Sequence, residues 1–195
     1  MPKTYSDVER EHIIKDLRET AGKALYSFGV KHTSVDYLVE KVKIPKGTFY
    51  LFYDSKEALF YDTLISFFTK AEEEYLEKLQ ELDENKIVTN LTSIFTDIIY
   101  SFYEKGLYHF LEDENYLLIM RKIPDEVQKQ NRIEIRSMLE KILEYFFIED
   151  KEDISNFISA FQALFYMLPF GEKIPNIKKA LTLLVRGLVL QLVGE

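Results

Sequence analysis

The chain has 195 residues, no cysteine and a formal net charge of −8. This length allows one good core or two compact units, and 47% hydrophobic with 30% charged residues is ordinary for a folded globular protein. The absence of cysteine excludes disulfides and thiolate metal sites, and it fits a reducing, cytoplasmic environment. We expect neither a secretion signal nor a membrane span, because no apolar run reaches the roughly 18 residues that a span needs.

Glycine and proline are scarce, with 7 and 5 residues, which favours a helical chain. Apolar residues recur at helical spacing in about nine segments, so we expect an all-α fold. The charge is uneven: Lys and Arg exceed Asp and Glu by two in residues 1–56, whereas residues 57–195 carry a net charge of −10. A polyanion would therefore meet the N-terminal quarter. We expect two domains, residues 1–53 and 54–195.

The first three helices have recognisable ends. Ser6 begins a capping-box pattern that predicts the start of the first helix, and Gly29 predicts its end. Thr33 is expected to cap a second helix, with Asp36 as a weaker box partner. Pro45 suits a first helical turn, so we expect it to open a short third helix that ends near Leu51.

The rest of the chain reads as longer helices. Asp54 is expected to cap a fourth helix that reaches about Leu82, and a polar break follows at residues 83–86. Further helices are expected over residues 87–102, as one or two short helices within 105–123, after Pro124, over 154–168 and over 176–193, with a loop at 169–175.

The tight link between the second and third helices is typical of a helix-turn-helix. The turn Val42–Ile44 is short enough to hold the two helices at a steep angle, which would let the third helix enter the major groove of duplex DNA. There Lys46 would neutralise a phosphate, and Thr48 would bond a base or touch a thymine methyl. Lys56, in the first turn of the fourth helix, would bind another phosphate. The expected exposed residues of the third helix are Lys46, Gly47, Thr48 and Tyr50.

Three runs in this region, Thr33–Leu38, Ile44–Tyr50 and Ser55–Leu59, are similar to the DNA-binding domain of TetR-type transcriptional regulators. The Lys-Gly-Thr-aromatic-Tyr run followed by Ser-Lys-Glu is a specific combination, within a match over roughly residues 10 to 62. The turn usually has glycine where this chain has Lys43. If that residue is left-handed, its side chain costs roughly 1–2 kcal/mol.

The resemblance implies an all-helical dimer that represses transcription from a palindromic operator. A small molecule that enters the C-terminal domain would change the separation of the DNA-binding units and release the DNA. The DNA contacts expected from the motif are Thr33, Ser34, Lys46, Gly47, Thr48, Tyr50 and Lys56. No enzyme is expected and no cofactor or metal is implied, because nucleotide-binding, hydrolase and zinc motifs are missing from the sequence.

The last helix is apolar around most of its circumference, so it must be buried from several sides. Pairing it and the preceding helix with their copies in a second chain would give a four-helix interface. The alternative is a central core helix within one subunit. The expected interface residues are Phe157, Phe161, Leu164, Leu181, Leu184, Leu188 and Leu192.

Aromatic residues are dense from Phe95 to Phe170, where they form either core or a cavity for an apolar or amphipathic small molecule. The expected cavity residues are Tyr103, Tyr108, Phe110, Tyr116, Phe161 and Phe165, with Arg121 and Gln162 as polar anchors. The alternative function is that of a helical carrier of small molecules or lipids without a DNA role. That alternative leaves the arrangement of Lys46 and Lys56 unexplained.

Overall fold

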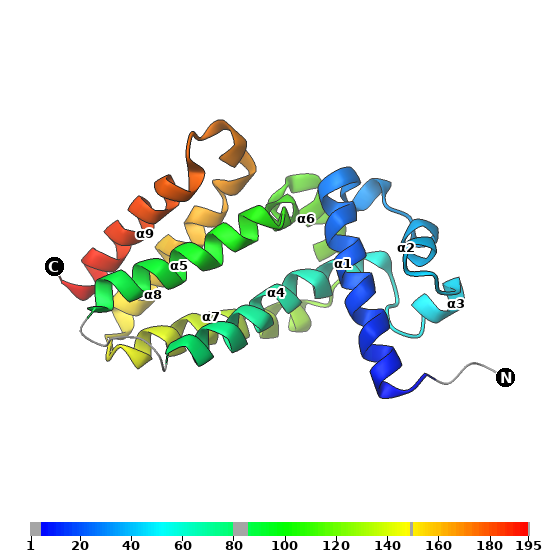
Figure 1. Cartoon of the computed structure of the whole chain (residues 1–195), viewed down its shortest axis with the longest axis horizontal. Coiled ribbons are helices and arrows are strands. Elements are labelled where there is room, and N and C mark those ends of the chain that lie inside the picture. Colours follow the sequence, from blue (N-terminus) through cyan, green and yellow to red (C-terminus); the bar gives the residue numbers. More distant parts are fainter. Residues whose placement is uncertain (1–4, 80–85, 149, 195) are drawn as a thin grey trace. The chain divides into compact units, whose positions relative to one another are not determined.

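The structure, a computed structural model, describes residues 5–79, 86–148 and 150–194 (Figure 1). These residues form helices and contain no strand, which confirms the expected all-α fold. The α-helices are α1 (Asp7–His32), α2 (Val35–Val42), α3 (Lys46–Phe49), α4 (Lys56–Leu79), α5 (Ile87–Glu104), α6 (Asp113–Met120), α7 (Asp125–Tyr145), α8 (Lys151–Phe165) and α9 (Ile177–Val193). Two 3₁₀ segments, η2 (Leu107–Leu111) and η3 (Leu168–Lys173), lie between helices.

The chain divides into two compact units, and the division differs from the expected boundary at residue 53. The first unit runs to Ser66 and also includes His109–Asp125; the second comprises Phe67–Tyr108 and the residues from Glu126 onward. The first unit gains α6 because apolar and polar groups of this segment pack on α1 and on the start of α4. Phe110, for example, meets Phe60 edge-on with ring centres 6.4 Å apart.

The ends of α1 follow the sequence signals. Ser6 Oγ accepts from Glu9 N at 3.3 Å and the Glu9 carboxylate accepts from Ser6 N at 2.9 Å, so the capping box is confirmed. Gly29 has φ 70° and ψ 174°, which interrupts the helix and leaves Val30–His32 as a separate turn. One side of α1 is apolar and buried, and includes Leu17 and Leu25; α1 packs against α2 and α6.

Two expected N-caps are wrong by one residue each. Ser34, and not Thr33, caps α2 by accepting from Tyr37 N at 3.1 Å, while the Thr33 hydroxyl donates to Gly29 O at 2.7 Å. The interruption at Gly29 leaves that carbonyl without a helical donor, and Thr33 supplies one. At α4, Ser55 Oγ accepts from Ala58 N at 3.1 Å in place of Asp54. The expected end of this helix near Leu82 lies outside the described residues.

The turn from α2 to α3 requires a left-handed residue. Lys43 has φ 59° and ψ 43°, and Ile44 N donates to Val39 O at 3.0 Å, as in a Schellman motif. Pro45 precedes α3 instead of opening it, and α3 is shorter than expected. The chain nevertheless stays coiled, because Tyr53 N donates to Phe49 O at 3.0 Å.

A set of polar contacts, which we call the Val30 clamp, fixes the passage from α1 to α2. Val30 N donates to Asn115 Oδ1 of α6 at 2.9 Å, and Val30 O accepts from Lys56 Nζ of α4 at 2.6 Å. The same ammonium donates to Thr33 O at 2.7 Å and to Lys31 O at 3.3 Å. One lysine thus satisfies three carbonyl groups at the end of α1.

Asn115 is itself held on both sides of its amide. Its Nδ2 donates to His109 O at 3.0 Å and to Glu112 Oε2 at 3.2 Å. The side chain is buried, and a Cβ placed on Gly29 would lie 3.1 Å from its Oδ1. The close approach of α6 to α1 therefore depends on glycine at position 29.

A second polar group links α1 to α4 and to the segment after α3. Arg18 donates from Nε and Nη2 to the Asp62 carboxylate at 2.7 and 2.8 Å, and Tyr53 donates its hydroxyl to the same carboxylate. Burial, together with the bond to Asp62, raises the pKa of Tyr53, so the phenol remains a donor. The hydrogen bonds to Asp62 also raise the pKa of Arg18.

The second unit is organised around α5, which packs against α9, while α9 also packs against α8. The apolar residues that recur at helical spacing in α5 are buried from Leu91 onward, whereas Ile87 at its start is half-buried. Phe95 lies with its ring centre 4.8 Å from that of Phe157 and 5.0 Å from that of Phe161. Farther along, Phe102 meets Phe165 edge-on at 5.1 Å.

The segment between α8 and α9 differs from the expected loop. α8 ends at Phe165, before the expected end at Leu168, and η3 covers most of the range expected to be a loop. A Cβ on Gly171 would lie 2.4 Å from Tyr103 Cε2, so η3 is seated directly on this tyrosine. α9 begins and ends close to the residues that the sequence predicts.

Replacing Lys43 by glycine should raise the free energy of unfolding by about 1 kcal/mol. A left-handed backbone costs a residue with a side chain roughly 1–2 kcal/mol, and the greater freedom of glycine in the unfolded chain returns part of this. Urea unfolding followed by circular dichroism measures the change. Lys41→Gly, on the exposed side of α2, should instead lower stability by about 1 kcal/mol. A loss of stability in Lys43→Gly would contradict the left-handed assignment.

Lys56→Met should lower the free energy of unfolding by about 1–3 kcal/mol, because it keeps the side-chain stem but leaves carbonyl groups of the Val30 clamp without a donor. Hydrogen exchange should also become faster at the amides of residues 30–34. Lys46→Met, which breaks an exposed ion pair, should have a much smaller effect on stability. If the two methionine variants unfold alike, the clamp does not contribute as described.

Candidate nucleic-acid interface

The outward side of α3 and of the turn that continues it carries four exposed residues, Lys46 and Gly47 in the helix and Tyr50 and Leu51 in the turn. Their spacing places them on one helical face, and the opposite face is formed by buried residues. Phe49 is fully buried and meets the Tyr50 ring edge-on at 5.3 Å. Apart from its chain neighbours and the backbone of its own helix, no atom lies within 4 Å of the place that a Cβ of Gly47 would occupy, so the backbone is open to close approach there.

Lys46 is exposed as expected, but it has a partner. Its Nζ lies 2.9 Å from a carboxylate oxygen of Asp36 in α2, and this hydrogen-bonded pair raises the pKa of Lys46. Asp36 is therefore not the partner of Thr33 in a capping box. It holds the lysine beside α3, where the charge remains accessible to solvent.

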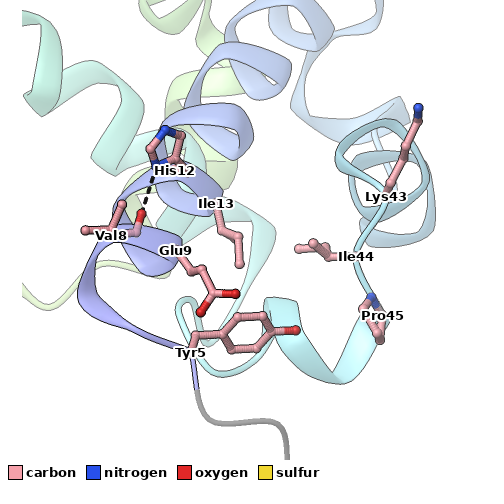
Figure 2. Close-up of a pocket in the computed structure, with 8 residues that line it drawn as sticks. All are labelled: Tyr5, Val8, Glu9, His12, Ile13, Lys43, Ile44 and Pro45. Carbon is pink, nitrogen blue, oxygen red and sulfur yellow. Dashed lines mark hydrogen bonds between the residues drawn. The ribbon is translucent and has the colours of Figure 1, made fainter.

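Thr48 does not face solvent, which corrects the expectation that it reads a base. Its side chain is only 7% exposed, and its Oγ1 lies 3.0 Å from the hydroxyl of Tyr5. In Figure 2 the Tyr5 ring extends from the start of α1 towards α3. The hydroxyl of Thr48 therefore ties the first helix to the third.

An open hollow of about 420 Å³ lies beside α3, where the ends of α1, α2 and α4 meet. It brings together five of the seven expected DNA contacts: Thr33, Ser34, Lys46, Tyr50 and Lys56. Six further lining residues were not expected from the sequence: Lys31, His32, Val35, Asp54, Ser55 and Glu57. The sequence feature that could have predicted the first two is the basic pair Lys31–His32, which lies directly before the motif.

Two residues of this hollow have structural roles and are not free to bind. The Thr33 hydroxyl is buried and donates to Gly29 O, and the Lys56 ammonium has carbonyl acceptors for all three of its N–H groups. The expectation that Lys56 offers its ammonium to a phosphate is therefore corrected. Lys31, which bridges to Glu114 at 2.7 Å, and Lys46 carry the exposed positive charge.

A second hollow of about 460 Å³ lies between the start of α1 and the α2–α3 turn (Figure 2). Its walls are mainly apolar and include Ile13, Ile44 and Pro45. Lys43 also lines it, but Figure 2 shows this side chain extending away from the other labelled residues. Its acidic residue, Glu9, is occupied by the capping box of α1.

The residues expected to bind a ligand are spread over the two units. Phe110, Tyr116 and Arg121 belong to the first unit, whereas Tyr103, Tyr108, Phe161, Gln162 and Phe165 belong to the second. The two expected polar anchors, Arg121 and Gln162, are exposed, as is Tyr116, which corrects their placement inside a cavity. Phe161 is a core residue packed on Phe95.

Four of the expected interface residues are buried within the second unit: Phe157, Phe161, Leu164 and Leu181. Their assignment to a dimer interface is corrected, because a partner chain could not reach them. Leu184 is 42% exposed, and its neighbour Leu183 is 72% exposed. Leu188 and Leu192 are partly exposed. α9 thus buries one side within the chain and leaves an apolar side open.

Other kinds of site find no support in the part of the chain that the structure describes. Among residues 5–79, 86–148 and 150–194, no three acidic or histidine side chains gather where they could hold a metal ion. None of the helices in these ranges combines the length and apolar character required to cross a membrane.

Comparison with known proteins identifies the fold. No protein-family model and no curated protein matches the sequence. The structure is similar to that of a Mesorhizobium loti protein assigned to the TetR family of transcriptional regulators, with a TM-score of 0.69 at 14% identity over 94% of this chain and 96% of the other. It is also similar to the fatty acid degradation regulator FadR from Bacillus halodurans, with a TM-score of 0.60 at 13% identity over 96% and 97% of the two chains. This chain has the all-α fold of TetR-family transcriptional regulators.

Proposed function

We propose that the protein is a dimeric transcription regulator that places α3 in the major groove of duplex DNA. The observation that carries this proposal is the exposed face of α3, with Lys46 and Tyr50 beside a hollow rimmed by Lys31 and Ser34. A cationic side chain, hydroxyl groups and an open glycine backbone are the groups that bind phosphates and base edges in a groove. Within this proposal the DNA contacts are Ser34, Lys46, Gly47 and Tyr50, with Lys31 added.

The charge distribution supports the same surface. Residues 1–56 have a small excess of basic residues, while the remainder of the chain has a net charge of −10. Long-range repulsion would keep DNA from the acidic part, and attraction would orient the basic part towards it. No catalytic role is needed to account for these residues.

The open side of α9 supports a homodimer. Leu183 and Leu184 lie close in sequence to Gly187, where a Cβ added to the glycine would meet nothing within 4 Å. Apolar side chains beside a glycine allow two helices to approach closely, and an isologous contact would bury both copies of this surface. A dimer would present two α3 helices to the two halves of a palindromic operator.

We further propose that the regulator is a repressor released by an apolar or amphipathic small molecule that binds in the second unit. The aromatic side chains of this unit, such as Phe102 and Phe165, provide the apolar surroundings that such a ligand needs. The Bacillus halodurans neighbour, a regulator of fatty acid degradation, is consistent with a ligand of this class. Binding would favour one separation of the two α3 helices over another.

Two substitutions at the Lys46–Asp36 pair should change DNA affinity in opposite directions. Lys46→Ala should weaken binding and reduce the salt slope by about one unit, because one phosphate contact is lost. Asp36→Asn should strengthen binding, because it removes a negative charge and releases the lysine. Fluorescence anisotropy with a labelled duplex of the DNA beside the protein's own coding region measures both effects.

Lys129→Ala in α7 gives the same change of net charge as Lys46→Ala and serves as the control. It should leave affinity nearly unchanged. If all three variants bind DNA alike, α3 does not contact it. If the unmodified protein binds no DNA at low salt, the regulator proposal fails and a carrier role becomes the better explanation.

Leu184→Glu should convert the dimer to a folded monomer, because it places a charge in the apolar contact between two α9 helices. Sedimentation velocity measures the mass, and circular dichroism checks the helix content. Val127→Glu is a matched control, since Val127 on α7 is 44% exposed against 42% for Leu184. It should leave the dimer intact. A dimer that persists in Leu184→Glu would show that this side of α9 is not the interface.

A further inference from the structure

Leu51 is a large apolar side chain on the exposed face next to α3, and it is 54% exposed. It was not among the contacts expected from the motif. Its backbone N–H donates to Thr48 O at 3.1 Å, so the residue continues the coil of α3 instead of leaving it. The side chain therefore belongs to the same surface as Lys46 and Tyr50.

This surface has two parallel stripes. Residues four apart lie on one side of a helical turn, so Lys46 and Tyr50 form a polar stripe and Gly47 and Leu51 form an apolar one. Because Gly47 has no side chain and a Cβ placed on it would meet nothing outside its own helix and chain neighbours within 4 Å, the surface is open at the Gly47 end of the apolar stripe. A group of about the size of a methyl could contact the leucine there.

The inward position of Thr48 leaves few groups for reading bases. Its hydroxyl is committed to Tyr5, and the Lys46 ammonium is held by Asp36. The apolar stripe, Gly47 and Leu51, is then expected to contribute more to the recognition of bases than the motif suggests. In the major groove the apolar feature that distinguishes one base from the others is the C5 methyl group of thymine.

We propose that Leu51, above the open backbone of Gly47, is a specificity-determining residue that contacts a thymine methyl in each half of the operator. This inference rests on the proposed DNA-binding function and adds the base that is read. A single exposed leucine has no meaning by itself, since isolated apolar residues are common on surfaces. The position of Leu51 on the exposed face of α3 gives it this role.

The test uses a duplex selected by the unmodified protein from a random-sequence library. Each thymine in the selected half-site is replaced in turn by deoxyuridine, which lacks only the C5 methyl group, and affinity is measured by fluorescence anisotropy at one salt concentration. At one position per half-site the replacement should weaken binding about fourfold, which corresponds to the burial of roughly one methyl group. Because only the DNA is changed, a loss of affinity cannot result from misfolding of the protein.

Leu51→Ala should then bind the thymine and deoxyuridine duplexes with equal affinity. Leu117→Ala is the matched control, because Leu117 is another exposed leucine of the first unit, at 64%, on α6. It should keep the full preference for thymine. Thermal unfolding of both variants should be unchanged, since neither leucine is buried.

The possible failures are distinct. Absence of binding to every duplex would overturn the proposed function itself. Binding with no thymine position sensitive to deoxyuridine would overturn only the inference about Leu51. A preference for thymine that persists in Leu51→Ala would assign the methyl contact to another residue and overturn the inference as well.

Discussion

The surface formed by α3 depends on how the backbone N–H and C=O groups of one residue, Val30, are hydrogen-bonded. Gly29 interrupts α1 before Val30, and the helix ends just after it at His32, so neither the N–H nor the C=O group of Val30 has the partner that a continuous helix would provide. Buried backbone groups must be paired. The Val30 N–H is paired with Asn115, and the Val30 C=O accepts from Lys56 at 2.6 Å and, at a longer distance of 3.4 Å, from Thr33 N. These bonds fix the direction in which the chain leaves α1 and enters α2, and α2 in turn positions α3.

Several motif residues therefore support the exposed surface of α3 from behind and are not part of it. The hydroxyls of Thr33 and Thr48 and the ammonium of Lys56 all turn inward to groups of the protein. Thr48 and Lys56 fix junctions between segments that are far apart in sequence, and Thr33 fixes the end of α1. Such residues would be needed for the helix arrangement even if they never touched DNA. A match to the motif is therefore stronger evidence for the fold than for individual DNA contacts.

Local signals explain what the sequence could predict. The capping box at Ser6, the stop at Gly29 and the stripe of α5 depend on residues within two or three turns, and all agree with the structure. The direction of Thr48 depends on Tyr5, which lies 43 residues away. Whether Phe157 faces α5 or a second chain likewise depends on tertiary packing, because an apolar stripe predicts that one side of a helix is buried but not which helix covers it.

The grouping of α6 with the first unit shows the same limit and has a physical consequence. Composition and motifs favoured a boundary near residue 53, because no sequence signal in residues 109–125 predicts that this segment packs against α1. In the structure, Asn115 of α6 holds the Val30 N–H while its own amide is bound to His109 O. A displacement of α6 must either carry Val30 with it or leave buried polar groups unpaired, which costs about 1–3 kcal/mol for each. A shift of α6 is therefore expected to change the direction in which the chain leaves α1.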